Sequence, residues 1–137
     1  MVVTSASFNA PRMKLPPVVL GMFVYKPSTV RYTNEIDLEV SRSLIGLGYP
    51  RDAQYVVQPY TKKSNIRRYS IVNKYKTVTQ QFTWRAGKVD FLTHAGGGSR
   101  GKRIGAFHYR GPDVPQPGNE HVYINLHLHN KHPLSRG

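Results

Sequence analysis

Three carboxylates lie close together in a chain that has few of them. The stretch N-E-I-D-L-E-V places Glu35, Asp37 and Glu39 at alternate positions, and the whole sequence contains only seven Asp and Glu residues. Such a set could cleave a glycosidic bond, which needs one ionised carboxylate as nucleophile and one protonated carboxylic acid as donor. Like charges packed side by side raise the proton affinity of at least one group, and so favour this division of roles.

The residues between the acids indicate the element that must position them. Ile36, Leu38 and Val40 alternate with the carboxylates, which is the pattern of a strand with one dry face and one wet face. Along an extended strand the Cα atoms of Glu35 and Glu39 lie about 13 Å apart, and side chains that lean together reduce this to the ~5 Å carboxyl separation of a retaining glycosidase. The alternative is a solvated acidic face or a weak cation site.

The rest of the chain predicts short strands and no long helix. Apolar or alternating runs bounded by Gly and Pro predict strands at about 6–15, 18–25, 32–42, 53–58, 67–72, 77–84, 88–93, 104–109 and 122–129. The first is expected at a sheet edge, and the nearly all-apolar 18–25 is expected to be central and covered on both faces. We therefore predict one all-β domain over 1–137, an antiparallel β-sandwich or jelly roll.

Composition excludes several other classes of protein and site. The chain has no Cys, which excludes a disulfide framework, a thiolate metal site and a cysteine nucleophile. The run H-L-H-N-K-H at 127–132 could bind a metal through alternate histidines, but no acidic partner is near in sequence, so no metal site is expected. No apolar run is long enough to cross a bilayer, and the N-terminus does not resemble a signal peptide.

The charge is strongly positive and unevenly distributed. Twenty Lys and Arg residues against seven acidic ones give +13, which would suit nucleic acid or a sulfated or carboxylated polysaccharide. The basic residues gather at Lys62, Lys63, Arg67, Arg68, Lys74 and Lys76, and again at Arg100, Lys102 and Arg103. Because such loop and edge positions also serve as solvated surface and as guards against edge pairing, we expect no specific nucleic-acid partner.

Further segments extend the pattern beyond the acidic stretch. In order, they read F-N-A-P-R-M-K-L, G-M-F-V-Y, A-Q-Y-V-V-Q-P-Y, Q-Q-F-T-W-R-A-G-K-V-D-F, G-P-D-V-P-Q-P-G-N-E and Y-I-N-L-H-L. Together with N-E-I-D-L-E, they resemble glycoside hydrolase family 16, whose signature is Glu-x-Asp-x-Glu on the concave face of a jelly roll. The resemblance implies a concanavalin A-like sandwich, an extracellular monomer without cofactor, and a polysaccharide substrate such as a β-glucan or an anionic glycan.

The resemblance also assigns roles to the carboxylates. It makes Glu35 the nucleophile, Asp37 the residue that tunes it and Glu39 the general acid/base. The spacing, with no extra residue before the last Glu, resembles the regular-strand branch of the family and not the bulged branch typical of laminarinases and agarases. Sandwich domains of this kind run to roughly 200–250 residues, so the resemblance implies an incomplete domain that lacks strands at both ends.

Candidate substrate-binding residues lie on two other predicted strands. Gln58 and Tyr60 follow the strand after the acids and could hydrogen-bond or stack on sugar, although solvent-facing or core positions are equally open. His127 stands where the family's closing strand carries Trp. Trp84 is the only tryptophan, and its place before an R-A-G turn favours a buried structural anchor.

The sequence therefore predicts a retaining glycoside hydrolase. One alternative is a carbohydrate-binding remnant of the same fold without catalysis, and another is a basic nucleic-acid-binding β-domain. The motif itself is compatible with both hydrolysis and transglycosylation.

Overall fold

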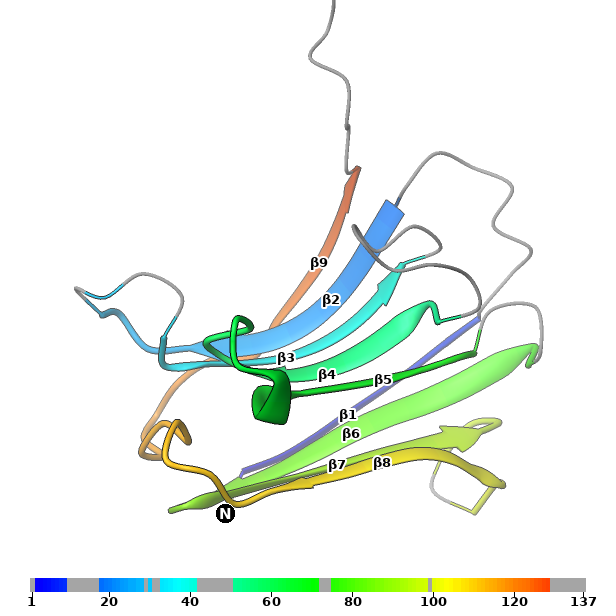
Figure 1. Cartoon of the computed structure of the whole chain (residues 1–137). Helices are drawn as coiled ribbons and strands as arrows, with labels where there is room; N and C mark the ends of the chain where they lie inside the picture. Colours follow the sequence, from blue (N-terminus) through cyan, green and yellow to red (C-terminus); the bar gives the residue numbers. More distant parts are fainter. Residues whose placement is uncertain are drawn as a thin grey trace, which may run out of the picture.

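The protein is an all-β sandwich of two antiparallel sheets, as predicted (Figure 1). The computed structural model describes residues 2–9, 18–28, 30, 33–41, 51–71, 75–98 and 100–128. Over this part of the chain the only helical element is the single-turn 3₁₀ helix η1 (Lys63–Asn65). None of the described residues forms a helix long and apolar enough to span a membrane.

The larger sheet has the strand order β5-β4-β3-β2-β9. Its strands are β2 (Val18–Tyr25), β3 (Glu35–Ser41), β4 (Ala53–Val57), β5 (Ile66–Tyr69) and β9 (Tyr123–Leu128). The second sheet has the order β1-β6-β7-β8, formed by β1 (Val2–Asn9), β6 (Thr77–Arg85), β7 (Lys88–Ala95) and β8 (Arg103–Tyr109). The chain thus passes between the sheets after β1, after β5 and after β8.

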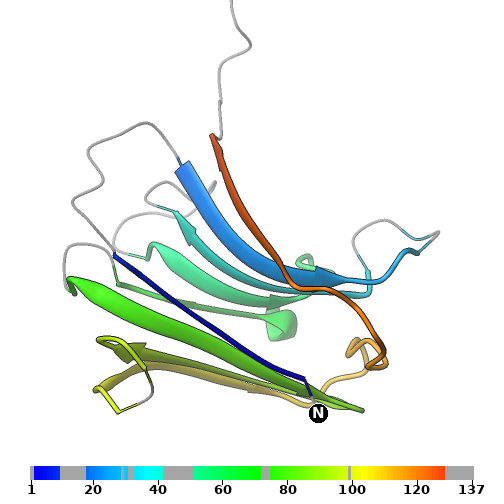
Figure 2. The ribbon, with the colours of Figure 1, turned by 180° about the vertical axis from the view of Figure 1, so that it is seen from behind.

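The larger sheet is curved. Figures 1 and 2 show it bending so that its concave side faces away from the second sheet, with β3 near its middle. Its convex side packs on the second sheet. Residues at alternate positions of β3 are therefore divided between the core and the concave face.

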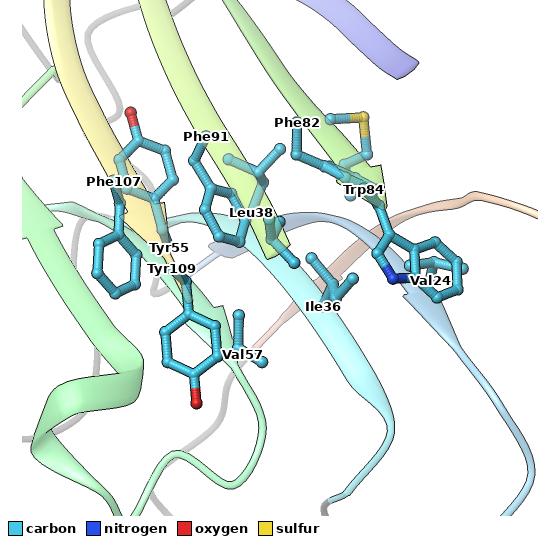
Figure 3. Close-up of a cluster of buried hydrophobic side chains, with 12 residues drawn as sticks. Val24, Ile36, Leu38, Tyr55, Val57, Phe82, Trp84, Phe91, Phe107 and Tyr109 are labelled. Carbon is cyan, nitrogen blue, oxygen red and sulfur yellow. The ribbon is translucent and has the colours of Figure 1, made fainter. Parts of the chain in front are cut away.

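The core is built from the inward-facing positions of both sheets (Figure 3). Ile36 and Leu38 of β3 are completely buried, as are Val89 and Phe91 of β7. Aromatic residues supply much of the second sheet's contribution, and the Phe91 and Phe107 rings stack 5.9 Å apart. This alternation holds the acidic strand in one register, because a slip by one residue would bury the carboxylates and expose its apolar side chains.

A polar layer crosses the core beside the aromatic residues. The hydroxyls of Tyr55 and Tyr69 both hydrogen-bond the Thr93 hydroxyl, at 2.5 and 2.9 Å. Gly105 makes room for them, since a Cβ at this position would stand 2.6 Å from the Tyr55 Oη. Trp84 is buried and donates its indole N–H to the carbonyl of Pro115 at 2.7 Å, so it is the structural anchor that the sequence predicted.

The predicted strands agree in number and order with those found among the described residues, but some bounds and one environment differ. The first strand is an edge strand as expected, but it begins at Val2 because all eight of its residues pair with β6. Residues 10–15 of the predicted strand lie outside the described residues. β5 ends at Tyr69, and the Ile71 amide donates to the Asp52 carboxylate at 2.7 Å instead of pairing in the sheet.

The expectation that 18–25 is covered on both faces holds for Val19 and Gly21 but not for the Tyr25 end of the strand. Met22 and Val24 face the core and are buried, but Tyr25, on the opposite face, is 42% exposed. The second sheet covers the convex side of β2, and the concave side is accessible at its Tyr25 end.

Candidate active site

β3 presents the three acids on the concave face. Asp37 is buried, with 4% of its surface exposed, whereas Glu35 and Glu39 are half-buried on either side of it. The pairing of β3 with both β2 and β4 continues without a register shift from Ile36 to Val40, so the acidic strand carries no bulge there. The carboxylates therefore follow one another along a regular strand.

The residue before this strand has a left-handed backbone conformation. Asn34 has a φ of 55°, in the left-handed region that Asn tolerates better than most residues. Its carbonyl accepts a hydrogen bond from the Lys26 amide at 2.9 Å, which closes the β2–β3 connection just before Glu35. The first carboxylate is thus held at the end of a hairpin and does not lie in a loose loop.

Two glutamines of the neighbouring chain segment hold the carboxylates. Gln54 on β4 donates from Nε2 to the Glu39 carboxylate at 2.5 Å, and Gln58 donates in the same way to Asp37 at 2.9 Å. Each amide oxygen accepts in turn, Gln54 from the Arg68 Nε at 3.3 Å and Gln58 from a backbone N–H at 2.8 Å. Because both ends of each amide are engaged, its orientation is determined by its partners.

The three acids have different environments. Burial raises the pKa of Asp37 well above its ordinary value, and a hydrogen bond with Glu35 raises it further. The negative charges of Glu35 and Glu39 act in the same direction, and only the hydrogen bond from Gln58 opposes them. Asp37 therefore retains its proton at a pH where an exposed Asp is ionised, and can donate it in a hydrogen bond to the adjacent carboxylate.

A group of three aromatic rings beside the acids was not identified from the sequence. Phe23 and Tyr25 lie opposite Asp37 and Glu35 in the β2–β3 register, and so share their face. Tyr123 of β9 stacks on Phe23 with ring centroids 5.5 Å apart, and its ring lies 5.4 Å from that of Tyr25. Tyr25 and Tyr123 are each 42% exposed.

We call Phe23, Tyr25 and Tyr123 the aromatic platform. Aromatic residues at alternate positions of the strand next to the acids were a signal for part of it in the sequence. Its third member comes from the far end of the chain, which no local pattern indicates.

The sequence-predicted binding residues are dispersed over the sheet. Gln58 lies at the acids. Tyr60 is 51% exposed and lies further toward β5, connected to the site through its backbone N–H, which donates to Gln58. His127 is paired with Val19 on β2, two strands from β3 and beyond Glu39 in register. The side chain of His127 and residues His129 and His132 lie outside the described part of the chain.

Within the described residues no group of three or more His, Asp or Glu side chains is placed to hold a metal ion. Asp37 hydrogen-bonds Glu35 and Gln58, and the Glu39 carboxylate accepts from Gln54. We found no match to the chain among protein-family models, curated proteins or solved structures.

Proposed function

We propose that the protein is a retaining glycoside hydrolase that acts on β-linked polysaccharides. The observation that supports this most directly is the row of three carboxyl groups on the concave face of the sandwich, with Asp37 buried between two more exposed glutamates. A double-displacement mechanism needs two carboxyl groups on one face, one as nucleophile and one as proton donor, and Glu35 and Glu39 flank Asp37 on that face. The resemblance to glycoside hydrolase family 16 agrees with this assignment.

In this proposal Glu35 attacks the anomeric carbon and Glu39 protonates the departing glycosidic oxygen. The products are a covalent glycosyl ester on Glu35 and a free leaving-group sugar. Glu39 then accepts a proton from water, which attacks the ester and restores the Glu35 carboxylate. Asp37, as a hydrogen-bond donor to Glu35, steadies the nucleophile before attack and receives part of its charge when the ester breaks.

The surrounding residues have positioning and binding roles. Gln54 on β4 and Gln58 just after it hold the carboxylates in place, and a small error in such placement can cost about a hundredfold in rate. The aromatic platform offers a flat surface to sugar rings next to Glu35. Gly21 lies opposite Glu39 in register and carries no side chain, which leaves space beside the proposed proton donor.

We predict that replacing Glu35 and replacing Glu39 change the catalytic activity in different ways. Glu35→Ala should reduce the release of reducing ends from soluble β-glucans to background, and azide or formate should restore turnover with inversion, because the anion occupies the vacated nucleophile position. Glu39→Ala should lose about 10²–10⁴-fold on glycans, and much less on activated aryl glycosides, which depart without protonation.

Asp90→Asn is the matched control, because it removes an acid from the outer face of the second sheet, where Asp90 pairs with Arg110 at 2.7 Å. The alternative from the same fold is carbohydrate binding without catalysis. That alternative is preferred if the unmutated protein binds a glycan that it never cleaves and Glu35→Ala binds it equally well.

A further inference from the structure

A basic hollow lies at the edge of the larger sheet, on the side away from the aromatic platform. It is an open depression with a volume of about 600 Å³, lined by Arg51, Tyr60, Lys63, Ile66, Arg67 and Arg68. Four of these six residues are cationic and none is acidic. A volume of this size is typical of small-ligand sites.

The hollow adjoins the acids through β4. Arg68 and Ile66 pair with Gln54 and Val56, whose neighbours in register on β3 are Glu39 and Asp37. Strands in a sheet are ~4.8 Å apart, so the β5 side of the hollow lies roughly 10 Å from the acidic strand. The Arg68–Gln54–Glu39 hydrogen bonds connect the two regions directly.

No described acidic side chain forms an ion pair with the cations of the hollow, and two of these cations are already ordered. The four ion pairs between described residues involve Lys26, Lys62, His108 and Arg110, and none of the four cations of the hollow. Arg68 is held on the face of the acids by its bond to Gln54. Arg67, which pairs with the core residue Tyr55, lies on the other face of β5 with its guanidinium 5.6 Å from the Phe107 ring. Like charges gathered in one hollow repel one another, so an anion that enters gains attraction and relieves repulsion. Ordered guanidinium groups also match the planar, two-oxygen faces of carboxylate and sulfate groups.

We propose that the basic hollow binds an acidic substituent of the glycan, a carboxylate or a sulfate on a sugar ring bound next to the catalytic acids. This inference rests on the proposed function and names its substrate class as an acidic polysaccharide. A nucleic acid fits less well, because a chain of phosphates running along this face would meet Glu35, Asp37 and Glu39. A glycan can place one anionic group in the hollow and a neutral ring at the carboxylates.

The test measures binding of three oligosaccharides of equal length, a neutral β-glucan, a sulfated galactan and a glucuronate-containing glycan. Titrations are made in the Glu35→Gln background, so that hydrolysis does not consume the probe. Arg51→Gln/Lys63→Gln neutralises two cations that make no described hydrogen bond, and Lys76→Gln/Lys102→Gln removes the same charge from exposed positions outside the hollow.

We expect the acidic probes to bind more tightly than the neutral one, and the hollow variant to weaken them by about three- to tenfold. Its effect on the neutral probe should be about twofold or less, and the control variant should leave all three nearly unchanged. The sulfated and glucuronate probes separate the two kinds of anion.

Equal affinity for neutral and acidic probes overturns the inference. An equal loss of affinity for the acidic probes in both double variants also overturns it, because it would indicate only general charge attraction. A short oligonucleotide is also tested as a competitor of the bound acidic glycan. If it competes as strongly as free acidic glycan does at the same concentration of negative charge, the inference is overturned. Selective binding of acidic glycans without any turnover would contradict the hydrolase and leave the acidic subsite standing. Turnover without any preference for acidic glycans would support the hydrolase and contradict the acidic subsite.

Discussion

The Asp37 carboxyl is buried beside two glutamates of its own strand, and its pKa is raised above its ordinary value mainly by that burial. The pKa of Asp113 is shifted in the opposite direction. Hydrogen bonds from Asn65 and Lys62 lower the pKa of Asp113. Two carboxyls of one small domain therefore make contributions to stability that depend on pH in opposite directions.

For Asp37, the unfolded chain loses the proton near pH 4, whereas the folded protein retains it to a higher pH. Between these two pKa values the folded state binds more protons, so the free energy of unfolding falls as pH rises, by at most about 1.4 kcal/mol per pH unit. Asn has no proton to lose. We predict that Asp37→Asn matches the unmutated protein near pH 4 and becomes progressively more stable than it toward neutral pH, while turnover falls.

Urea unfolding from pH 4 to 8 measures this difference. Asp113→Asn is the control with the opposite sign, because a lowered folded pKa stabilises above about pH 4 and that contribution is lost as pH falls through the folded value. Parallel stability profiles for Asp37→Asn and the unmutated protein would contradict a raised pKa at Asp37.

At the scale of elements, the site is assembled from strands that are distant in sequence. β3 supplies the acids, β4 and the segment after it supply the glutamines, and β2 and β9 supply the aromatic platform. β5 carries part of the basic hollow. A glycan lying across the strands would thus contact aromatic rings first, then carboxylates, then cations.

The role of the aromatic platform can be tested by a substitution on β9. Tyr123→Ala removes the ring that contacts both Phe23 and Tyr25, and should weaken binding of neutral and acidic oligosaccharides alike by about five- to thirtyfold, or ~1–2 kcal/mol. Ile124→Ala is the matched control, since Ile124 is adjacent, 68% exposed and on the opposite face of the same strand. Isothermal titration distinguishes them, and equal losses in both variants would contradict a role for the platform.

At the scale of the whole molecule, the net charge of +13 creates a field that attracts any polyanion. We predict that DNA or RNA binding is independent of sequence and decreases roughly a thousandfold between about 50 and 200 mM salt, because it depends on release of counterions. Fluorescence anisotropy with labelled oligonucleotides at several salt concentrations measures this. Tight binding to one sequence at physiological salt would favour the nucleic-acid-binding alternative over the enzyme.

The sequence by itself determined the strands and the face on which the acids lie. Alternation of Glu35, Asp37 and Glu39 with Ile36 and Leu38 depends on local geometry alone, because a strand turns every second side chain to the same side. The Gly87 turn between β6 and β7, with a φ of 73°, was likewise readable from adjacent residues. Burial of Trp84 also followed from its residue type and its place before that turn.

Only the tertiary structure decided which strands are neighbours. The meeting of Tyr123 with Phe23, the clustering of Arg51 with Arg68 and the exposure of Tyr25 depend on sheet order and curvature, which involve contacts between residues far apart in the chain. The raised pKa of Asp37 depends partly on the sequence and partly on the tertiary structure. Like charges at alternate positions follow from sequence, but burial, its largest cause, exists only once the sheet has formed around the strand.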